Sequence, residues 1–153
     1  ASGTGPYSSA VLGEDGTLHV AYMQDDAFSL LYESVNAQGV SSNPEIIMRG
    51  LRDTGSEWLV SRIGEDVQIQ LDVSNQPEVV FQDATLHRLM HVRRNGSGAW
   101  MSTVLSQKTE PFDGSHGFYP ELLRQGGTSL VVEYVINKQT DPTTAYPAIY
   151  PLP

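Results

Sequence analysis

The sequence predicts an all-β protein, a β-propeller fragment of about three four-stranded blades, and three observations lead to this class. Apolar residues alternate along short segments such as 18–22 and 77–81, and no sustained apolar run follows the 3.6-residue period of a helix. Turn residues such as Asp15-Gly16 separate these segments. A four-strand unit recurs, and a recurring unit of about 45 to 60 residues is typical of a propeller blade. A small antiparallel β-sandwich or barrel is the alternative.

The first two units match without gaps. Phe81 lies 59 residues after Tyr22, and the same offset aligns apolar with apolar residues and turn with turn residues. The aligned pairs are Leu12 with Leu71, Val20 with Val79, Leu30 with Leu89, Asn36 with Asn95, and Gly39 with Gly98. A weaker third copy places Tyr134 53 residues after Phe81. We therefore predict a single repeat domain over residues 1–153, with units at approximately 5–50, 65–107 and 117–153.

Four strands are expected in each of the first two units. They should span 8–13, 17–24, 29–35 and 45–48 in the first, and 67–73, 78–82, 88–94 and 100–105 in the second. The third unit has candidate strands at 119–124 and 130–137 and lacks an obvious last strand. Its proline-rich tail, 145–153, predicts an edge strand or a docked arm, because each proline removes a ladder donor. The insertions 50–64 and 108–117 are candidate binding loops.

The predicted ring is incomplete. A propeller closes with about four to eight blades, and this chain holds two to three. Open blade faces and edges invite association. We expect the chain to be part of a larger ring, completed by another copy, by another protein subunit, or by the remainder of a cleaved precursor.

The composition limits the partners and the location. The net charge of -9 disfavours nucleic acid and anionic membranes as partners. No apolar run approaches the ~20 residues that span a bilayer, so membrane insertion is not expected. The chain has no cysteine and begins Ala1-Ser2-Gly3 without an initiator methionine, which fits removal of an export signal and an arbitrary chain boundary equally. Low charge with many Gly, Pro, Ser and Thr favours a secreted or periplasmic location.

Two segments, 15–25 and 93–100, carry a family resemblance. The string 15–25 resembles the second strand of blades in sialidase-like propellers of the bacterial-neuraminidase-repeat type, and 93–100 lies where that family has its Asp box. In that box Asn95 stands for the aspartate, Ser97 for the glycine and Arg93 for the opening Ser or Thr, while Trp100 is kept. The arginine triad and the Tyr-Glu nucleophile pair of the family cannot be placed. The resemblance therefore implies the architecture and no catalysis.

The basic residues near the second unit's third strand are candidate ligands. His87 and His91 are four residues apart, which on a strand separates them by roughly 13 Å, too far to share a metal ion. With Arg88 and Arg93 they could bind a carboxylate, a sulfate or an acidic sugar, because guanidinium groups grip such anions bidentately. Packing of the histidines between blades, and pairing of the arginines with the protein's own carboxylates, are the alternatives.

Glu133 is the remaining candidate site residue. In the sequence repeat it takes the place of Ala21 and Val80, so a carboxylate replaces an apolar residue on a core strand. Such departures from a pattern concentrate at functional sites. Pairing with Arg124 would be a structural explanation.

No cofactor is expected, although calcium could bind acidic groups at 14–15, at 25–26 or near Asp113. The favoured function is a non-enzymatic binding or assembly module that contacts protein or carbohydrate. The alternatives are a glycan-processing enzyme of sialidase-like or polysaccharide-lyase-like architecture and a structural subunit of a large extracytoplasmic complex. An enzyme needs convergent acids or bases at strand starts near the ring axis. Those strands look largely apolar, as at Leu71 and Leu122, which favours the binding module.

Overall fold

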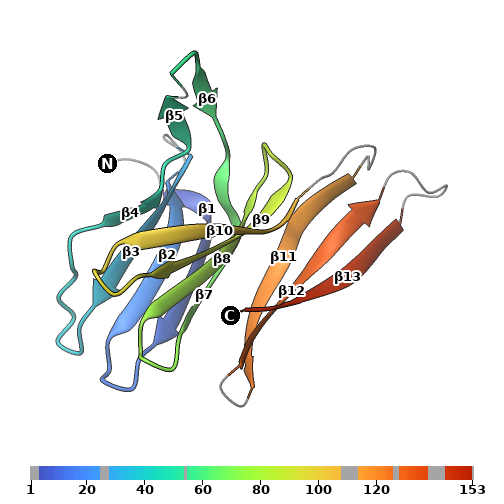
Figure 1. The fold of residues 1–153 in the computed structure, drawn as a ribbon. Helices are drawn as coiled ribbons and strands as arrows, with labels where there is room; N and C mark the ends of the chain where they lie inside the picture. Colours follow the sequence, from blue (N-terminus) through green and yellow to red (C-terminus); the bar gives the residue numbers. More distant parts are fainter. Residues whose placement is uncertain are drawn as a thin grey trace.

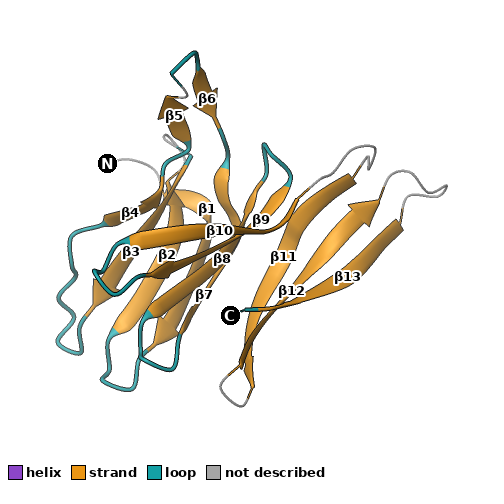
Figure 2. Ribbon diagram, in the orientation of Figure 1, coloured by secondary structure: helices purple, strands orange, loops and turns teal. Residues whose placement is uncertain are grey.

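The structure, a computed structural model, describes residues 4–24, 28–53, 55–107, 114–125, 128–137 and 144–152. Strands, turns and loops account for all of these residues, so the all-β class is confirmed (Figure 2). No helix within them is long and apolar enough to cross a membrane.

Three antiparallel sheets make up the body of the molecule (Figure 1). Sheet 1 contains β1 (Thr4–Leu12), β2 (Leu18–Gln24), β3 (Ser29–Val35) and β4 (Glu45–Met48) in sequential order. Sheet 2 contains β7 (Ile63–Leu71), β8 (Pro77–Asp83), β9 (Arg88–Arg94) and β10 (Trp100–Gln107), also in sequential order. Sheet 3 contains β11 (Gly114–Gln125), β12 (Thr128–Asn137) and β13 (Thr144–Pro151). Each sheet is a meander, as in a propeller blade.

The turns of sheets 1 and 2 repeat at the offset of 59 residues. Gly13 N–H donates to Thr17 O, and Asp72 N–H donates to Gln76 O, both across 2.8 Å. The second turn repeats as well, because the Oδ1 atoms of Asn36 and Asn95 each accept backbone N–H groups two and four residues later. Side-chain oxygens that bind their own turn in this way fix its geometry. Identical turns give the two sheets the same register.

The sheets pack face to face in chain order. The core between sheets 1 and 2 is built around residues such as Leu30 and Phe81, both fully buried. The core between sheets 2 and 3 is built around Val80, Leu89 and Val131, also fully buried. We call the face of a sheet that is directed at the preceding sheet its leading face, and the opposite one its trailing face. Both faces of sheet 2 are therefore buried, and sheet 2 lies at the centre of the structure. Each Å² of apolar surface buried at these cores stabilises the fold by roughly 25 cal/mol.

The first strand of each sheet is bulged near its start. Ladder register shifts between Thr4 and Ser8 in β1, around Glu65 in β7 and around Phe118 in β11. In β7 and β11 the bulge brings two residues to positive φ, at Gly64 (92°) and Asp66 (49°) and, 53 residues later, at Gly117 (87°) and Tyr119 (46°). Extra residues in a bulge bend the strand and redirect its side chains.

The register of β12 corrects the sequence alignment of Glu133. Gln68 pairs with Val80, and the equivalent residue of β11, Glu121, pairs with Val132. Glu133 therefore occupies the position of Phe81, on the leading face, and not that of Val80. The cause is the hairpin, since four residues (125–128) separate the paired Arg124 and Ser129 whereas five (72–76) separate Leu71 and Pro77.

The insertion 50–64 forms a small hairpin of β5 (Leu51–Asp53) and β6 (Trp58–Val60), which projects from one end of the sheets (Figure 1). Gly50 anchors its base, because a Cβ there would lie 2.1 Å from Phe28 O. Of the insertion 108–117, residues 108–113 lie outside the described residues. The proline-rich tail forms β13, the edge strand of sheet 3 in the described part of the chain.

Candidate functional site at the inner strands

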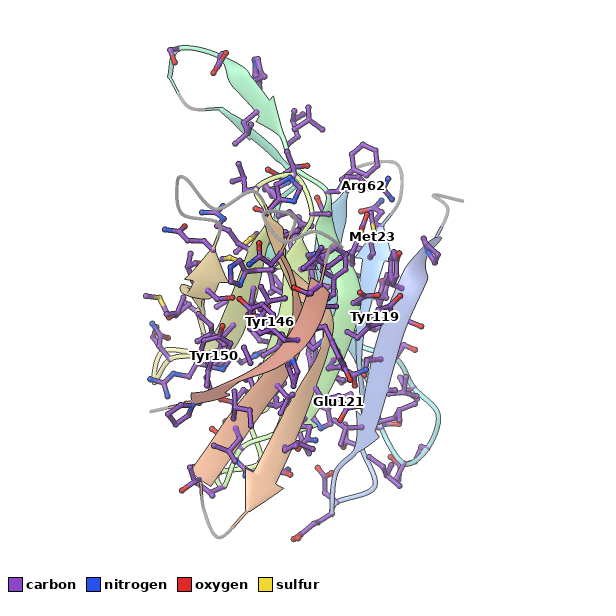
Figure 3. The ribbon with its side chains drawn as sticks, turned by 90° about the vertical axis from the view of Figure 1, so that its right-hand side faces the viewer. Met23, Arg62, Tyr119, Glu121, Tyr146 and Tyr150 are labelled. Carbon is purple, nitrogen blue, oxygen red and sulfur yellow. The ribbon has the colours of Figure 1, made fainter. Side chains whose placement is uncertain are left out.

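A pocket opens where the three bulged strands meet, and we call it the axial pocket. Its volume is about 340 Å³. Three consecutive residues from each of β1, β7 and β11 line it: Pro6, Tyr7, Ser8, Asp66, Val67, Gln68, Tyr119, Pro120 and Glu121. In Figure 3, Tyr119 and Glu121 lie along the flank of sheet 3 that is next to β1 and β7. The repeat thus supplies one wall of the pocket from each sheet.

The bulges create this site. Tyr7, Asp66 and Tyr119 stand at equivalent positions, 59 and 53 residues apart. The Tyr119 N–H donates to Asp66 Oδ2 across 3.1 Å, which ties β11 to β7 at the pocket. The Tyr119 residue remains 71% exposed, so the face of its phenol ring is available to a ligand.

The pocket is acidic. Burial, followed by the Glu65 and Asp66 carboxylates, raises the pKa of Tyr7 above its ordinary value. Arg62 pairs with Glu65 across 2.7 Å and so offsets one of these charges. None of the lining residues is Lys or Arg. Anions are therefore disfavoured, whereas two phenols, an amide and two carboxylates suit a neutral ligand rich in hydroxyl groups.

The candidate residues His87 and Arg88 lie at the turn between β8 and β9. His87 is exposed at positive φ (52°), and its Nδ1 forms a hydrogen bond of 2.8 Å with Ser115 Oγ. Arg88 is paired with the fully buried Asp83 across 3.0 Å. Both side chains thus contribute contacts within the protein.

His91 and Arg93 lie further along β9 on the trailing face of sheet 2. His91 is buried, and its Nε2 lies 2.8 Å from Glu78 Oε1. Glu78 also accepts a hydrogen bond from Ser129 of sheet 3 across 3.3 Å. Arg93 is exposed at the far end of the strand from His87. The structure does not gather these four residues around one point, and an anion site there stays a prediction.

Glu133 is fully buried between sheets 2 and 3 and is surrounded by donors. Its Oε1 accepts from Ser106 Oγ (2.6 Å) and from the Tyr150 hydroxyl (2.7 Å) and lies 3.1 Å from His116 Nδ1, while its Oε2 accepts from the Gly117 N–H. The suggested partner Arg124 donates instead to Leu71 O. Glu133 therefore holds the bulge of β11, which presents Tyr119 to the axial pocket.

Tyr150 gives this cluster a pH dependence. Burial, followed by the hydrogen bond to Glu133, raises its pKa from 10.0 to about 12. Because the folded-state pKa is the higher one, the stabilisation is fully present below about pH 10 and is lost as the pH rises through 12. We expect the free energy of unfolding to fall more steeply over this range in the native protein than in Tyr150→Phe. Urea unfolding at several pH values measures this, and equal slopes would contradict it.

Sequence reasoning missed the residues of the axial pocket. The signal was the recurrence of glycine at positions 5, 64 and 117, each followed two residues later by Tyr7, Asp66 or Tyr119. Among the described residues no group of three His, Asp or Glu side chains is arranged to hold a metal ion. Asp25, Asp26 and Asp113, named above for calcium, lie outside the described residues.

No protein-family model matches this chain, and no curated protein matches it. A solved structure that resembles it is a Bacteroides ovatus β-propeller described as Xyloglucan PUL GH43B. The TM-score is 0.50 at 11% sequence identity, over 92% of this chain and 28% of the neighbour. The chain therefore has a fold of the β-propeller class and spans 28% of the length of that neighbour.

Proposed function

We propose that this chain is a non-enzymatic carbohydrate-binding segment of a β-propeller, which takes a neutral sugar chain into the axial pocket. The observation that carries the proposal is the convergence of Tyr7, Asp66, Tyr119 and Glu121, at bulges of three equivalent strands, on one open pocket.

The chemistry of the pocket suits a sugar. Phenol rings offer an apolar face and a hydroxyl group in one side chain. The C–H faces of a pyranose ring can pack on Tyr119, which is largely exposed. The hydroxyl groups of the sugar can donate hydrogen bonds to the carboxylates of Asp66 and Glu121 and can form hydrogen bonds with the side-chain amide of Gln68. Few polar groups placed around an apolar surface are typical of small-ligand sites.

The neighbour supports the same substrate class, because its name refers to xyloglucan. The finer resemblance to sialidase-type repeats gains support from the Asn95 turn. Asn95 Oδ1 accepts from Ser97 N–H, Ser97 Oγ and Ala99 N–H, so it organises its turn as an aspartate would. Trp100 packs at the adjoining core, with its ring centroid 5.4 Å from that of Tyr32.

One observation favours a second candidate function, glycoside hydrolysis. Asp66 and Glu121 both line the axial pocket, and most glycosidases use a pair of carboxyl groups. We favour binding because Asp66 already accepts the Tyr119 N–H. The rest of these strands also presents apolar residues such as Ile69 and Leu122 to the cores.

Calorimetric titration with xyloglucan oligosaccharides tests the proposal. We expect Tyr119→Ala to weaken binding about tenfold, equivalent to about 1.4 kcal/mol, through loss of the stacking surface. Tyr146→Ala is the matched control, because Tyr146 is also exposed, at 44%, but does not line the pocket. Undetectable binding at millimolar ligand, or equal weakening by both variants, would contradict binding at this site. Release of reducing ends that Asp66→Asn abolishes would establish hydrolysis instead.

A further inference from the structure

Two sheet faces at opposite ends of the stack are apolar and open. On the leading face of sheet 1, Val20 and Tyr22 are half-buried, while Leu12 and Ile46 are 67% and 41% exposed. On the trailing face of sheet 3, Val132 is half-buried, while Tyr134 and Ile149 are 48% and 63% exposed. The ladder pairs assign these residues to one face each, because opposite residues of an antiparallel pair share a face. Figure 1 shows no described strand covering either face.

The two internal junctions show what such faces contact when they are covered. The leading face of sheet 2 meets the trailing face of sheet 1, and the leading face of sheet 3 meets the trailing face of sheet 2. Val79 and Val131, which are equivalent to Val20, are fully buried there. Val80, which is equivalent to Val132, is fully buried as well.

Glycines on the first strands set the close approach at both junctions. A Cβ on Gly64 would lie 3.0 Å from Leu30 Cδ1 and 3.6 Å from Met23 Cβ. A Cβ on Gly117 would lie 3.0 Å from Gln82 Cγ. Met23 and Gln82 are equivalent positions, 59 residues apart, so both junctions use one docking geometry.

Sheet 3 has a residue equivalent to Met23 and Gln82, and it lies on the open trailing face. This residue is Tyr134 on β12. It lines an apolar pocket of about 350 Å³ with Phe118, Tyr119, Ile136 and Ala145. Gly5, in the register of Gly64 and Gly117, lies on the first strand of sheet 1. The trailing face of sheet 3 and the first strand of sheet 1 therefore carry the two kinds of residue that meet at each internal junction.

We propose that a second copy of this chain covers both faces, with the leading face of sheet 1 in each copy packed on the trailing face of sheet 3 in the other. Each of the two junctions joins unlike faces, and a two-fold axis relates one junction to the other, so that two copies close into a ring of six sheets. Six lies within the range of about four to eight blades at which propellers close. Each copy supplies what the other lacks, so no further chemistry is required of the occupant. The inference does not rest on carbohydrate binding.

Three matched substitutions test this by sedimentation velocity and light scattering at micromolar concentration. Val20→Arg places a charge on the leading face, and Val132→Arg places one on the trailing face. Val73→Arg is the control, because Val73 is 75% exposed in the turn between β7 and β8. We expect the native chain and the control to be dimers and both face variants to be folded monomers, with circular dichroism checking the fold.

Mixing the two monomeric variants gives the sharper result. Val20→Arg retains a native trailing face and Val132→Arg retains a native leading face, so one native junction can form between them. We expect a one-junction heterodimer in the mixture, although neither variant dimerises alone. A monomeric native chain, open polymers, or a mixture that stays monomeric would overturn the proposal, as would dimerisation that both face substitutions leave unchanged.

Discussion

Replacing Glu133 with alanine is expected to lower the free energy of unfolding by about 3–5 kcal/mol, because several buried donors lose their acceptor at a cost of roughly 1–3 kcal/mol each. The carboxylate is fully buried and accepts from Ser106, Tyr150 and the Gly117 N–H. Without it, the two hydroxyl groups and the Gly117 N–H lose this buried acceptor. Sheet 3 should then loosen from sheet 2 before the rest unfolds.

Urea unfolding, followed by tryptophan fluorescence and by circular dichroism, measures this loss. Glu14→Ala is the matched control, because Glu14 is exposed in the turn between β1 and β2 and should change stability by less than about 0.5 kcal/mol. A loss below about 1 kcal/mol for Glu133→Ala would show that the cluster is not a structural tie. Sugar binding should weaken together with stability, since Glu133 holds the strand that carries Tyr119.

Replacing Gly117 with alanine is expected to cost about 2–4 kcal/mol, from two separable causes. The first is the positive φ of 87°, which costs a residue with a Cβ about 1 kcal/mol. The second is crowding, because the Cβ would lie 2.8 Å from Arg88 O and 3.0 Å from Gln82 Cγ. Overpacking of this kind typically adds about 1–3 kcal/mol.

Gly98→Ala separates the two causes. Gly98 has nearly the same φ, 82°, but nothing lies within 4 Å of the point that a Cβ would occupy. We expect this variant to lose only about 1 kcal/mol in the same urea experiment. If the two alanine variants lost equal stability, the close approach of β11 to sheet 2 would not be a source of strain.

The strands of sheets 1 and 2 could be predicted because local turn chemistry sets them. Asn36 and Asn95 close the same turn with the same hydrogen bonds, so residues at one offset reach one register. The predicted strands 29–35 and 88–94 coincide with β3 and β9. Turn residues of this kind can be recognised in the sequence even where the core residues of sheets 1 and 2 differ.

The position of Glu133 and the axial pocket could not be predicted in the same way. A hairpin one residue shorter shifts every later residue of sheet 3 to the other face relative to a gapless alignment. The pocket depends on bulges, which leave no alternation pattern in the sequence. Its residues, such as Asp66 and Tyr119, come from strands more than 50 residues apart, and only the packing of the sheets brings them together.

The prolines of β13 limit how another strand can pair with the edge of sheet 3. Leu152 N–H donates to Ser129 O, so the even-numbered amides of β13 point at β12 and the odd-numbered ones point outward. Pro147 and Pro151 fall on the outward set and leave Ile149 as the donor between them. β13 has four outward positions, Ala145, Pro147, Ile149 and Pro151, and the two prolines have no N–H. A strand added at this edge would therefore lack half of the N–H donors, which disfavours cross-β extension. The edge that β13 forms in the described part of the chain is thereby a poor template for strand pairing, whereas the outer faces of sheets 1 and 3 stay open.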